Sequence, residues 1–137
     1  MAQALPRLDG LHVFVIEDDD DSRSLLAQTL EYLGALVSAT TAADLALDDL
    51  KEFRPSAIVC DLAMPRMDGV AFIRTLRAHA DAQTRDIPVI AVTAYYERYT
   101  RDEMLGIGAT EYFKKPIGLE ALCAAIDRHR PRRNLSA

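Results

Sequence analysis

Short apolar runs alternate along the chain with stretches in which apolar residues recur every three or four positions. The apolar runs are rich in β-branched residues and favour buried strands, whereas the longer spacing favours amphipathic helices. The pattern predicts five strands, over 11–16, 35–39, 56–60, 87–92 and 110–113. It predicts five helices that follow them in turn, over 22–33, 42–53, 68–80, 96–107 and 119–130.

This order is a strand followed by a helix, five times over. Strands that are apolar on both faces, separated by amphipathic helices, indicate a parallel sheet covered on both sides. Right-handed crossovers leave few topologies for such a sheet. We therefore expect an α/β fold, a doubly wound (βα)5 parallel sheet of flavodoxin-like type with strand order 2-1-3-4-5.

Length and composition fit one folded domain. The chain has 137 residues, of which 50% are apolar and 27% charged, and this balance excludes a wholly disordered chain. No apolar run is long enough to predict a membrane span. We expect the domain over 11–130, a lead-in over 1–10 and a tail over 131–137, with residues 1–9 and the tail frayed.

The N-terminus and the cysteines indicate a cytoplasmic protein. The first ten residues lack the apolar stretch of a secretory signal. Cys60 and Cys123 have no disulfide-framework or zinc-site spacing, and a reducing compartment is the simple interpretation.

Charge is unevenly distributed. The net charge is −5, with −8 on residues 1–61 and +3 on residues 62–137. The acidic run 17–21 needs water, a cation or helix N–H groups to offset its repulsion. The acidic balance argues against direct nucleic-acid binding, and a basic C-terminal cluster is better explained as a solvated helix end: Arg128, Arg130, Arg132 and Arg133.

Five polar residues follow the predicted strands, where open α/β sheets bind ligands. Glu17 and Asp18 follow the first strand, Asp61 the third, Thr93 the fourth and Lys115 the fifth. Each residue alone is more often a cap, a β-former or part of a surface turn. Their joint occurrence at one edge of the sheet favours a site.

The chemistry of this set suits a metal and a phosphoryl group. Convergent carboxylates are costly without a cation, and Mg²⁺ prefers carboxylates together with a phosphate oxygen. A hydroxyl and an ammonium beside a metal-bound carboxylate can hold the remaining phosphoryl oxygens. Asp61 would then be the nucleophile that forms an acyl phosphate.

Four segments carry a resemblance to one family. Val15-Ile16-Glu17-Asp18-Asp19 is similar to a first-strand motif with an acidic pair, and the nine residues 61–69, DLAMPRMDG, resemble a phosphoacceptor segment. Val92-Thr93-Ala94 and Lys115-Pro116 match two further motifs. Over residues 11–130 the chain resembles the CheY-like receiver domain of two-component response regulators.

The resemblance implies that Asp61 is the phosphorylated residue. It implies Mg²⁺ bound by Asp18, Asp61 and the backbone carbonyl of Ala63. Glu17, which stands where Asp is commoner in the family, would act mostly through water.

The resemblance also implies a switch. Thr93 would follow the phosphoryl group, Lys115 would pair with it, and Tyr112 would be the aromatic that rotates. Ala63 and Tyr95 occupy the positions that tune phosphoryl lifetime in the family. Ala63 offers no side chain to orient water and Tyr95 can cover the site, so we predict slow self-dephosphorylation.

The partners implied are those of a phosphorelay. The phosphodonor would be a sensor histidine kinase or a histidine phosphotransfer protein, and the chain would catalyse only its own phosphorylation and dephosphorylation. An unidentified downstream protein would bind the face formed by 96–107, 110–113 and the last helix, which is also a candidate homodimer interface. Both a stand-alone protein and the receiver of a hybrid histidine kinase remain open.

Other interpretations stay open at this point. Tyr95, Tyr96 and Tyr99 either pack on the domain and its surface or form a docking patch. An aspartate-nucleophile phosphatase would need a different acid arrangement after the first strand. A flavin-binding module would need a loop there that attracts phosphate. A receiver-like scaffold that is not phosphorylated is the third rival.

Overall fold

Five parallel strands form a single sheet in the computed structural model, which describes residues 5–131. The strands are β1 (His12–Ile16), β2 (Leu36–Thr40), β3 (Ala57–Asp61), β4 (Val89–Thr93) and β5 (Glu111–Lys114). Their order is β2-β1-β3-β4-β5, which confirms the predicted doubly wound, flavodoxin-like topology.

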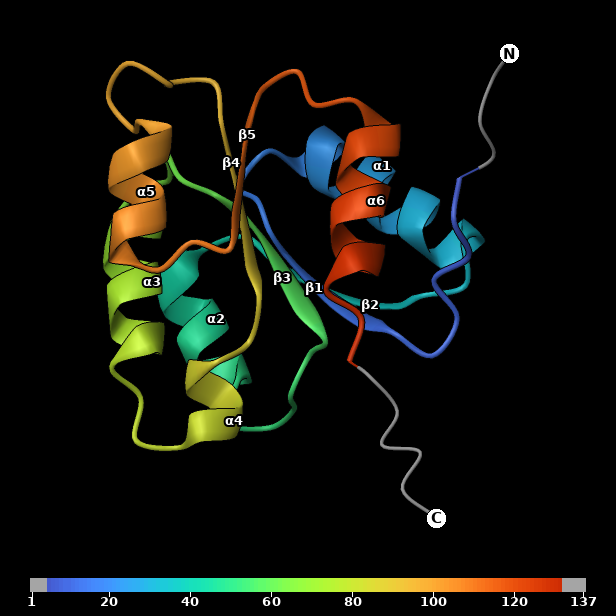
Figure 1. Ribbon diagram of the computed structural model, residues 1–137, viewed down its shortest axis with the longest axis horizontal. Coiled ribbons are helices and arrows are strands. Elements are labelled where there is room, and N and C mark those ends of the chain that lie inside the picture. The colour runs from blue at the N-terminus through green and yellow to red at the C-terminus, as the bar shows by residue number, and fades with distance from the viewer. Residues whose placement is uncertain (1–4, 132–137) are drawn as a thin grey trace.

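The helices cover both faces of this sheet. They are α1 (Asp20–Tyr32), α2 (Ala43–Asp49), α3 (Gly69–Arg77), α4 (Ala82–Arg85), α5 (Arg101–Ile107) and α6 (Leu119–Arg128). Figure 1 shows α1 and α6 together on one side of the strands and α2, α3 and α5 on the other. The three-layer arrangement follows from strands that are apolar on both faces.

Two apolar cores result, one on each face. Phe14, Phe72 and Tyr112 are fully buried in the core beneath α2, α3 and α5. Leu30 and Leu122 belong to the core between the sheet and the pair α1 and α6. Both cores hold the strands rigidly, so the residues at the carboxyl ends of the strands are fixed relative to one another.

Polar caps set where the helices begin. The Asp19 carboxylate accepts the Ser22 N–H at the start of α1, and Asp68 accepts the Ala71 N–H at the start of α3. Thr100 caps α5 in the same way. These caps anchor two of the loops that carry the candidate site.

The segment 96–107 departs from the sequence prediction. Helix α5 spans only Arg101–Ile107, and residues 96–98 form a turn instead. The physical reason is that Tyr99 is buried on the domain and Thr100 serves as the helix cap, so the chain cannot be helical through both. The four-residue helix α4 was not predicted.

The lead-in also differs from expectation where it is described. Residues 5–9 were expected to fray, but Leu8 is fully buried and its N–H donates to the carbonyl of Leu33. Arg130 donates to the carbonyls of Arg7 and Asp9, which ties the lead-in to the end of α6. The rest of the predicted frayed ends, 1–4 and 132–137, lies outside the described residues.

Within residues 5–131, none of the helices combines the length and the apolar composition that crossing a bilayer requires. Cys60 and Cys123 are both buried and both free, so no disulfide joins them.

Candidate functional site

The carboxyl ends of four strands deliver the candidate residues to one edge of the sheet. Asp61 and Thr93 are the last residues of β3 and β4, and Glu17 and Lys115 directly follow β1 and β5. Backbone hydrogen bonds continue the sheet past these ends. The Glu17 N–H donates to Thr40 and the Lys115 N–H donates to Thr93, so neither residue lies on a loose loop.

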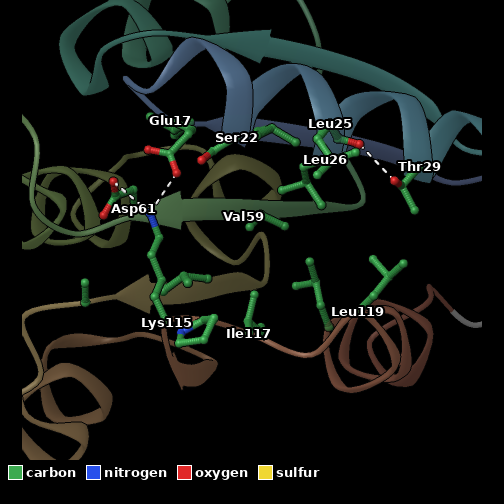
Figure 2. A pocket seen from close by; sticks show the side chains of 16 residues that line it. Glu17, Ser22, Leu25, Leu26, Thr29, Val59, Asp61, Lys115, Ile117 and Leu119 are labelled. Atoms are coloured by element: carbon green, nitrogen blue, oxygen red, sulfur yellow. Dashed lines mark hydrogen bonds and ion pairs between the residues drawn. The ribbon is translucent and has the colours of Figure 1, made fainter.

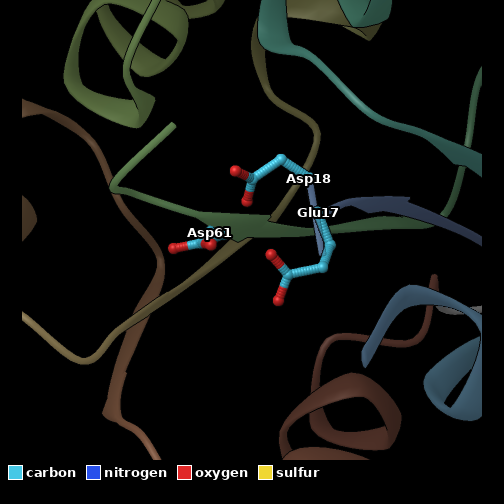
Figure 3. Close-up of side chains that lie close together, drawn as sticks. All are labelled: Glu17, Asp18 and Asp61. Atoms are coloured by element: carbon cyan, nitrogen blue, oxygen red, sulfur yellow. The ribbon is translucent and has the colours of Figure 1, made fainter. Parts of the chain in front are cut away.

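Three carboxylates meet at this edge. Glu17, Asp18 and Asp61 each offer an oxygen, and the three oxygens lie within 4.8 Å of one another. Figure 3 shows the three side chains converging from the ends of two strands. Glu17 and Asp61 are 7% and 8% exposed, whereas Asp18 is exposed. Oxygen donors of this kind, two shielded and one open to solvent, fit a hard cation such as Mg²⁺.

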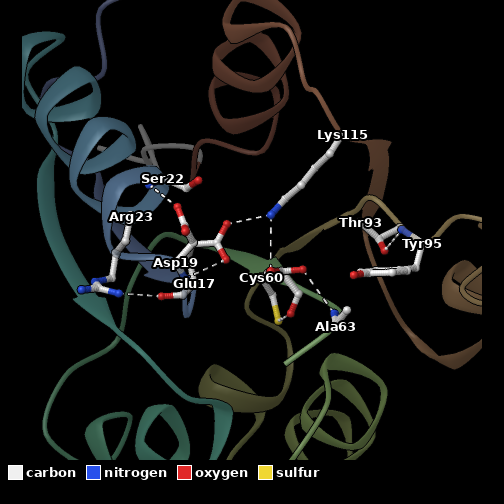
Figure 4. A network of polar contacts seen from close by, with 10 residues as sticks. Glu17, Asp19, Ser22, Arg23, Cys60, Ala63, Thr93, Tyr95 and Lys115 are labelled. Atoms are coloured by element: carbon white, nitrogen blue, oxygen red, sulfur yellow. Dashed lines mark hydrogen bonds and ion pairs between the residues drawn. The ribbon is translucent and has the colours of Figure 1, made fainter. Parts of the chain in front are cut away.

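One ammonium lies against two of these acids. Lys115 Nζ is 2.7 Å from Glu17 Oε1 and 3.3 Å from Asp61 Oδ2 (Figure 4). The Lys115–Pro116 peptide bond is cis. Residues 98 positions apart in the sequence are thus in direct contact. Three carboxylates and one ammonium leave the cluster with a net negative charge that a divalent cation can offset.

Burial and mutual repulsion shape the protonation of the cluster. Burial, together with the nearby Asp61 carboxyl, raises the pKa of Glu17 above its ordinary value despite Lys115. For Lys115, burial acts to lower the pKa, but Glu17 and Asp61 outweigh it and the pKa is raised. Lys115 is therefore held in its charged form at neutral pH.

The second oxygen of Asp61 is held by the chain that follows it. The Ala63 N–H donates to Asp61 Oδ1 at 3.2 Å. Together with Lys115 on Oδ2, this contact fixes the plane of the Asp61 carboxylate. The structure therefore brings Ala63 to the site through its backbone amide.

Thr93 is placed at the site's edge but is oriented elsewhere. It is fully buried, and its hydroxyl accepts the N–H of Tyr95 at 2.9 Å (Figure 4). Within residues 5–131, the side-chain carboxylate of Asp61 accepts hydrogen bonds from Lys115 and the Ala63 amide, and none from Thr93. The ring of Tyr95 is 62% exposed. Thr93 thus lies on the strand next to that of Asp61, and its hydroxyl is bound to the amide of the turn that follows β4.

Tyr112 lies inside the domain. Its side chain is buried and its hydroxyl donates to the carbonyl of Tyr99. The guanidinium of Arg101 lies 5.3 Å from the centre of the ring and donates to the Tyr112 carbonyl. Of the three neighbouring tyrosines, Tyr99 is packed on the domain.

Sequence reasoning missed the residues that brace the acidic loop. Arg23 Nη1 donates to the carbonyl of Glu17, and Nη2 pairs with Asp20. Asp19 caps α1 and so is not free to join the metal ligands. An arginine one turn into the helix that follows an acidic run was the available signal.

A largely apolar pocket of about 660 Å³ opens beside the cluster (Figure 2). It lies between α1 and α6, where Leu25, Leu26 and Leu119 line it, and Lys115 and Asp61 stand at one end. Leu25 is exposed, so the mouth of this pocket is apolar as well.

The doubly wound sheet and the acidic cluster with its lysine define a class, an α/β domain of flavodoxin-like fold with a candidate cation site at the strand ends. Residues 13–127 match the family described as the response regulator receiver domain. The chain therefore belongs to the receiver family of two-component signalling.

Relatives support this assignment. The chain is 37% identical over 115 residues to an uncharacterized 14.6 kDa protein in the sodA1 3′ region of Leptolyngbya boryana, covering 84% of each chain. It is 35% identical over 116 residues to the response regulator MprA of Mycolicibacterium vanbaalenii, covering 85% of this chain and 48% of MprA. The chain thus spans about half the length of the MprA relatives it matches.

Solved structures agree. The receiver domain of a signal transduction histidine kinase from Syntrophus aciditrophicus is similar with a TM-score of 0.80 and 28% identity, over 88% of this chain and 89% of that one. The receiver domain of a sensor histidine kinase from Pseudomonas aeruginosa PAO1, solved with a magnesium ion coordinated in its active-site cleft, has a TM-score of 0.77 and 27% identity, over 87% and 96% of the two chains.

Proposed function

We propose that this domain accepts a phosphoryl group on Asp61 from a phosphohistidine, with Mg²⁺ as cofactor. The observation that carries the proposal is the convergence of Glu17, Asp18 and Asp61 with the Lys115 ammonium. A buried carboxylate with an ammonium on one side and further oxygen ligands on the other is suited to attack phosphorus and to tolerate the charge that develops.

Asp18, Asp61 and the carbonyl of Ala63 would hold the metal, with Glu17 acting through water. When bound, the metal supplies positive charge to phosphoryl oxygens. The donor set fits this ion because it consists of hard oxygens with an open, solvent-facing side at Asp18.

The transfer itself is a displacement at phosphorus. An Asp61 oxygen forms the new P–O bond while the P–N bond to the donor imidazole breaks, and the imidazole leaves with its electron pair and takes up a proton. Lys115 stays protonated, since its pKa is raised, and pairs with the transferred group. The Ala63 N–H keeps the carboxylate oriented during the approach.

The switch runs through Thr93 and Tyr112. The new phosphoryl oxygens attract the Thr93 hydroxyl away from the Tyr95 amide. The turn at residues 95–99 and the side chain of Tyr112 then change conformation, and this alters the surface formed by α5, β5 and α6. A downstream protein, or a second copy of the domain, reads that surface. Couplings of this kind are typically about 1–3 kcal/mol.

The phosphoryl group is expected to be long-lived. Ala63 carries no side chain that could orient an attacking water, and the Tyr95 ring lies at the exposed side of the Thr93 turn. We also propose that the receiver domain spans 11–130 and that the protein is cytoplasmic. The phosphoryl donor would be a sensor histidine kinase or a histidine phosphotransfer protein. The two free buried cysteines support the location.

Mass spectrometry tests the proposal. The wild type and Asp61→Asn are each incubated with acetyl phosphate, once with Mg²⁺ and once with a chelator in its place. The mass of each protein is then measured. We expect one added phosphoryl mass in the wild type with Mg²⁺ and none in Asp61→Asn. Equal labelling of both proteins would refute the assignment of Asp61, and equal labelling with and without Mg²⁺ would refute the role of the metal.

A further inference from the structure

Tyr99 occupies an unusual place between two parts of the domain. It stands in the connection between β4 and α5 and is 4% exposed, on the face of the sheet covered by α3 and α5. Its hydroxyl lies 3.2 Å from Asp68 Oδ2, where it can donate a hydrogen bond. A buried tyrosine hydroxyl that reaches across to another loop fixes the position of its own backbone.

Asp68 is itself firmly anchored to the phosphoacceptor loop. Its other oxygen, Oδ1, accepts the Ala71 N–H at 3.0 Å and caps α3. The adjacent Gly69 N–H donates to the carbonyl of Leu62, the residue after Asp61. A Cβ at position 69 would come within 2.8 Å of Leu62 Cα, so the two segments are in backbone contact. Movement at the end of β3 is therefore transmitted to Asp68.

The other side of Tyr99 holds the switch tyrosine. The Tyr99 carbonyl accepts a hydrogen bond from the hydroxyl of Tyr112, and the Tyr112 side chain is fully buried. A continuous chain of hydrogen bonds thus runs from the capped start of α3 through Tyr99 to β5. Burial, helped by the charge of Asp68, raises the pKa of Tyr99, so its hydroxyl remains a donor.

We propose that Tyr99 is a positioning residue that couples the loop after Asp61 to Tyr112, through its hydroxyl on Asp68 and its carbonyl on the Tyr112 hydroxyl. The functional meaning of this coupling rests on the proposed roles of Asp61 and Tyr112. It forms a second route between them that does not pass through Thr93. The same contacts explain why the segment before Arg101 is a turn rather than the first part of a helix.

Three conservative variants separate this role from simple packing. Tyr99→Phe removes only the hydroxyl. Asp68→Ser keeps a good helix cap but is too short to reach Tyr99. Tyr32→Phe is the control, since it removes a hydroxyl from an exposed tyrosine of α1, on the opposite face of the sheet.

The first readout needs no phosphoryl donor. Amide hydrogen exchange and the ring signals of ¹³C-labelled tyrosine are measured on the full chain. We expect Tyr99→Phe and Asp68→Ser each to raise exchange across residues 95–100 by about tenfold and to shift the Tyr112 ring signals. The double variant should shift them no further than either single one, and Tyr32→Phe should leave them unchanged.

The second readout adds acetyl phosphate and Mg²⁺. Tyr99→Phe should become phosphorylated to the wild-type level while the Tyr112 signals respond at most half as much. Additive shifts in the double variant, or a full Tyr112 response in Tyr99→Phe, would overturn the coupling. If the wild type takes up no phosphoryl group, the proposed function fails, and the first readout still decides the role of Tyr99.

Discussion

The two ends of β1 are polar in different ways. At the amino end, His12 Nε2 pairs with the Ser38 hydroxyl at 2.8 Å, the His12 N–H donates to Ser56, and the ring stacks on Phe53. At the carboxyl end, three carboxylates lie together and two of them, Glu17 and Asp61, pair with one ammonium. The amino end thus holds polar groups that are hydrogen-bonded to one another, whereas the carboxyl end brings several negative charges together.

The contrast separates polar groups that stabilise the fold from those kept for chemistry. Hydrogen-bonded pairs at the amino end cost little to bury. Clustered carboxylates destabilise the folded domain unless a cation joins them, so their presence at a rigid strand edge favours a cation site there. Changes at the two ends should therefore have opposite consequences for the stability of the domain.

Removal of a metal ligand should have the largest effect. Asp18→Asn should lower the affinity for Mg²⁺ by at least about tenfold, because a charged oxygen ligand is lost. The measurement is a Mg²⁺ titration followed by amide NMR signals. Asp21→Asn, a nearby exposed acid in the first turn of α1, is the control and should change the affinity little. An equal loss in both variants would mean that only general charge matters.

Removal of the Lys115 ammonium should have the next largest effect. Lys115→Met leaves Glu17 and Asp61 without their cation and should lower the free energy of unfolding by about 1–2 kcal/mol, since the side chain is partly exposed. Saturating Mg²⁺ should recover much of the loss. Denaturant unfolding measures both. Lys114→Met removes a lysine whose ammonium lies over the Tyr96 ring and should cost about 0.5 kcal/mol.

Neutralisation of a clustered acid should stabilise the protein. Burial raises the pKa of Glu17, so the carboxylate form opposes folding at neutral pH. Without Mg²⁺, Glu17→Gln should raise the free energy of unfolding by about 0.5–1 kcal/mol. A loss of stability in this variant would show that the Lys115 ion pair outweighs the repulsion.

The smallest effect should be a difference in pH dependence. Burial lowers the pKa of His12 below 6.5, so its contribution is present above that pH and is lost as the pH falls through the folded value. The raised pKa of Glu17 acts in the opposite sense, with its contribution present at low pH and lost as the pH rises. In unfolding experiments between about pH 7 and about pH 5, His12→Phe should lose less stability than the wild type. If the free energy of unfolding changed with pH by the same amount in both proteins, His12 would not contribute to the pH dependence.

The sheet and most of the site could be predicted because both follow from strand placement. Parallel strands with a known order bring residues 17, 61 and 115 to one edge, although no local pattern links Glu17 with Lys115. The orientation of Thr93 could not be predicted, because its hydroxyl is bound by an amide two residues later.

Tertiary contacts also overrode local pattern elsewhere. The apolar spacing over 96–107 suits a helix, but the contact of Tyr99 with Asp68 keeps its first part in a turn. Leu8 looked like part of a frayed end and is buried, because α1 and α6 leave room for it that no sequence pattern shows. The short helix α4 is too brief for periodicity to reveal.

We propose that the acids at the carboxyl edge of the sheet form one metal site around Asp61. Crystals soaked in Mn²⁺, which shares the preference of Mg²⁺ for carboxylate and carbonyl oxygens, test it directly through anomalous scattering. We predict a single strong peak bound by Asp18, Asp61 and the carbonyl of Ala63. A peak on the exposed acids of α1, with none beside Asp61, would contradict the account.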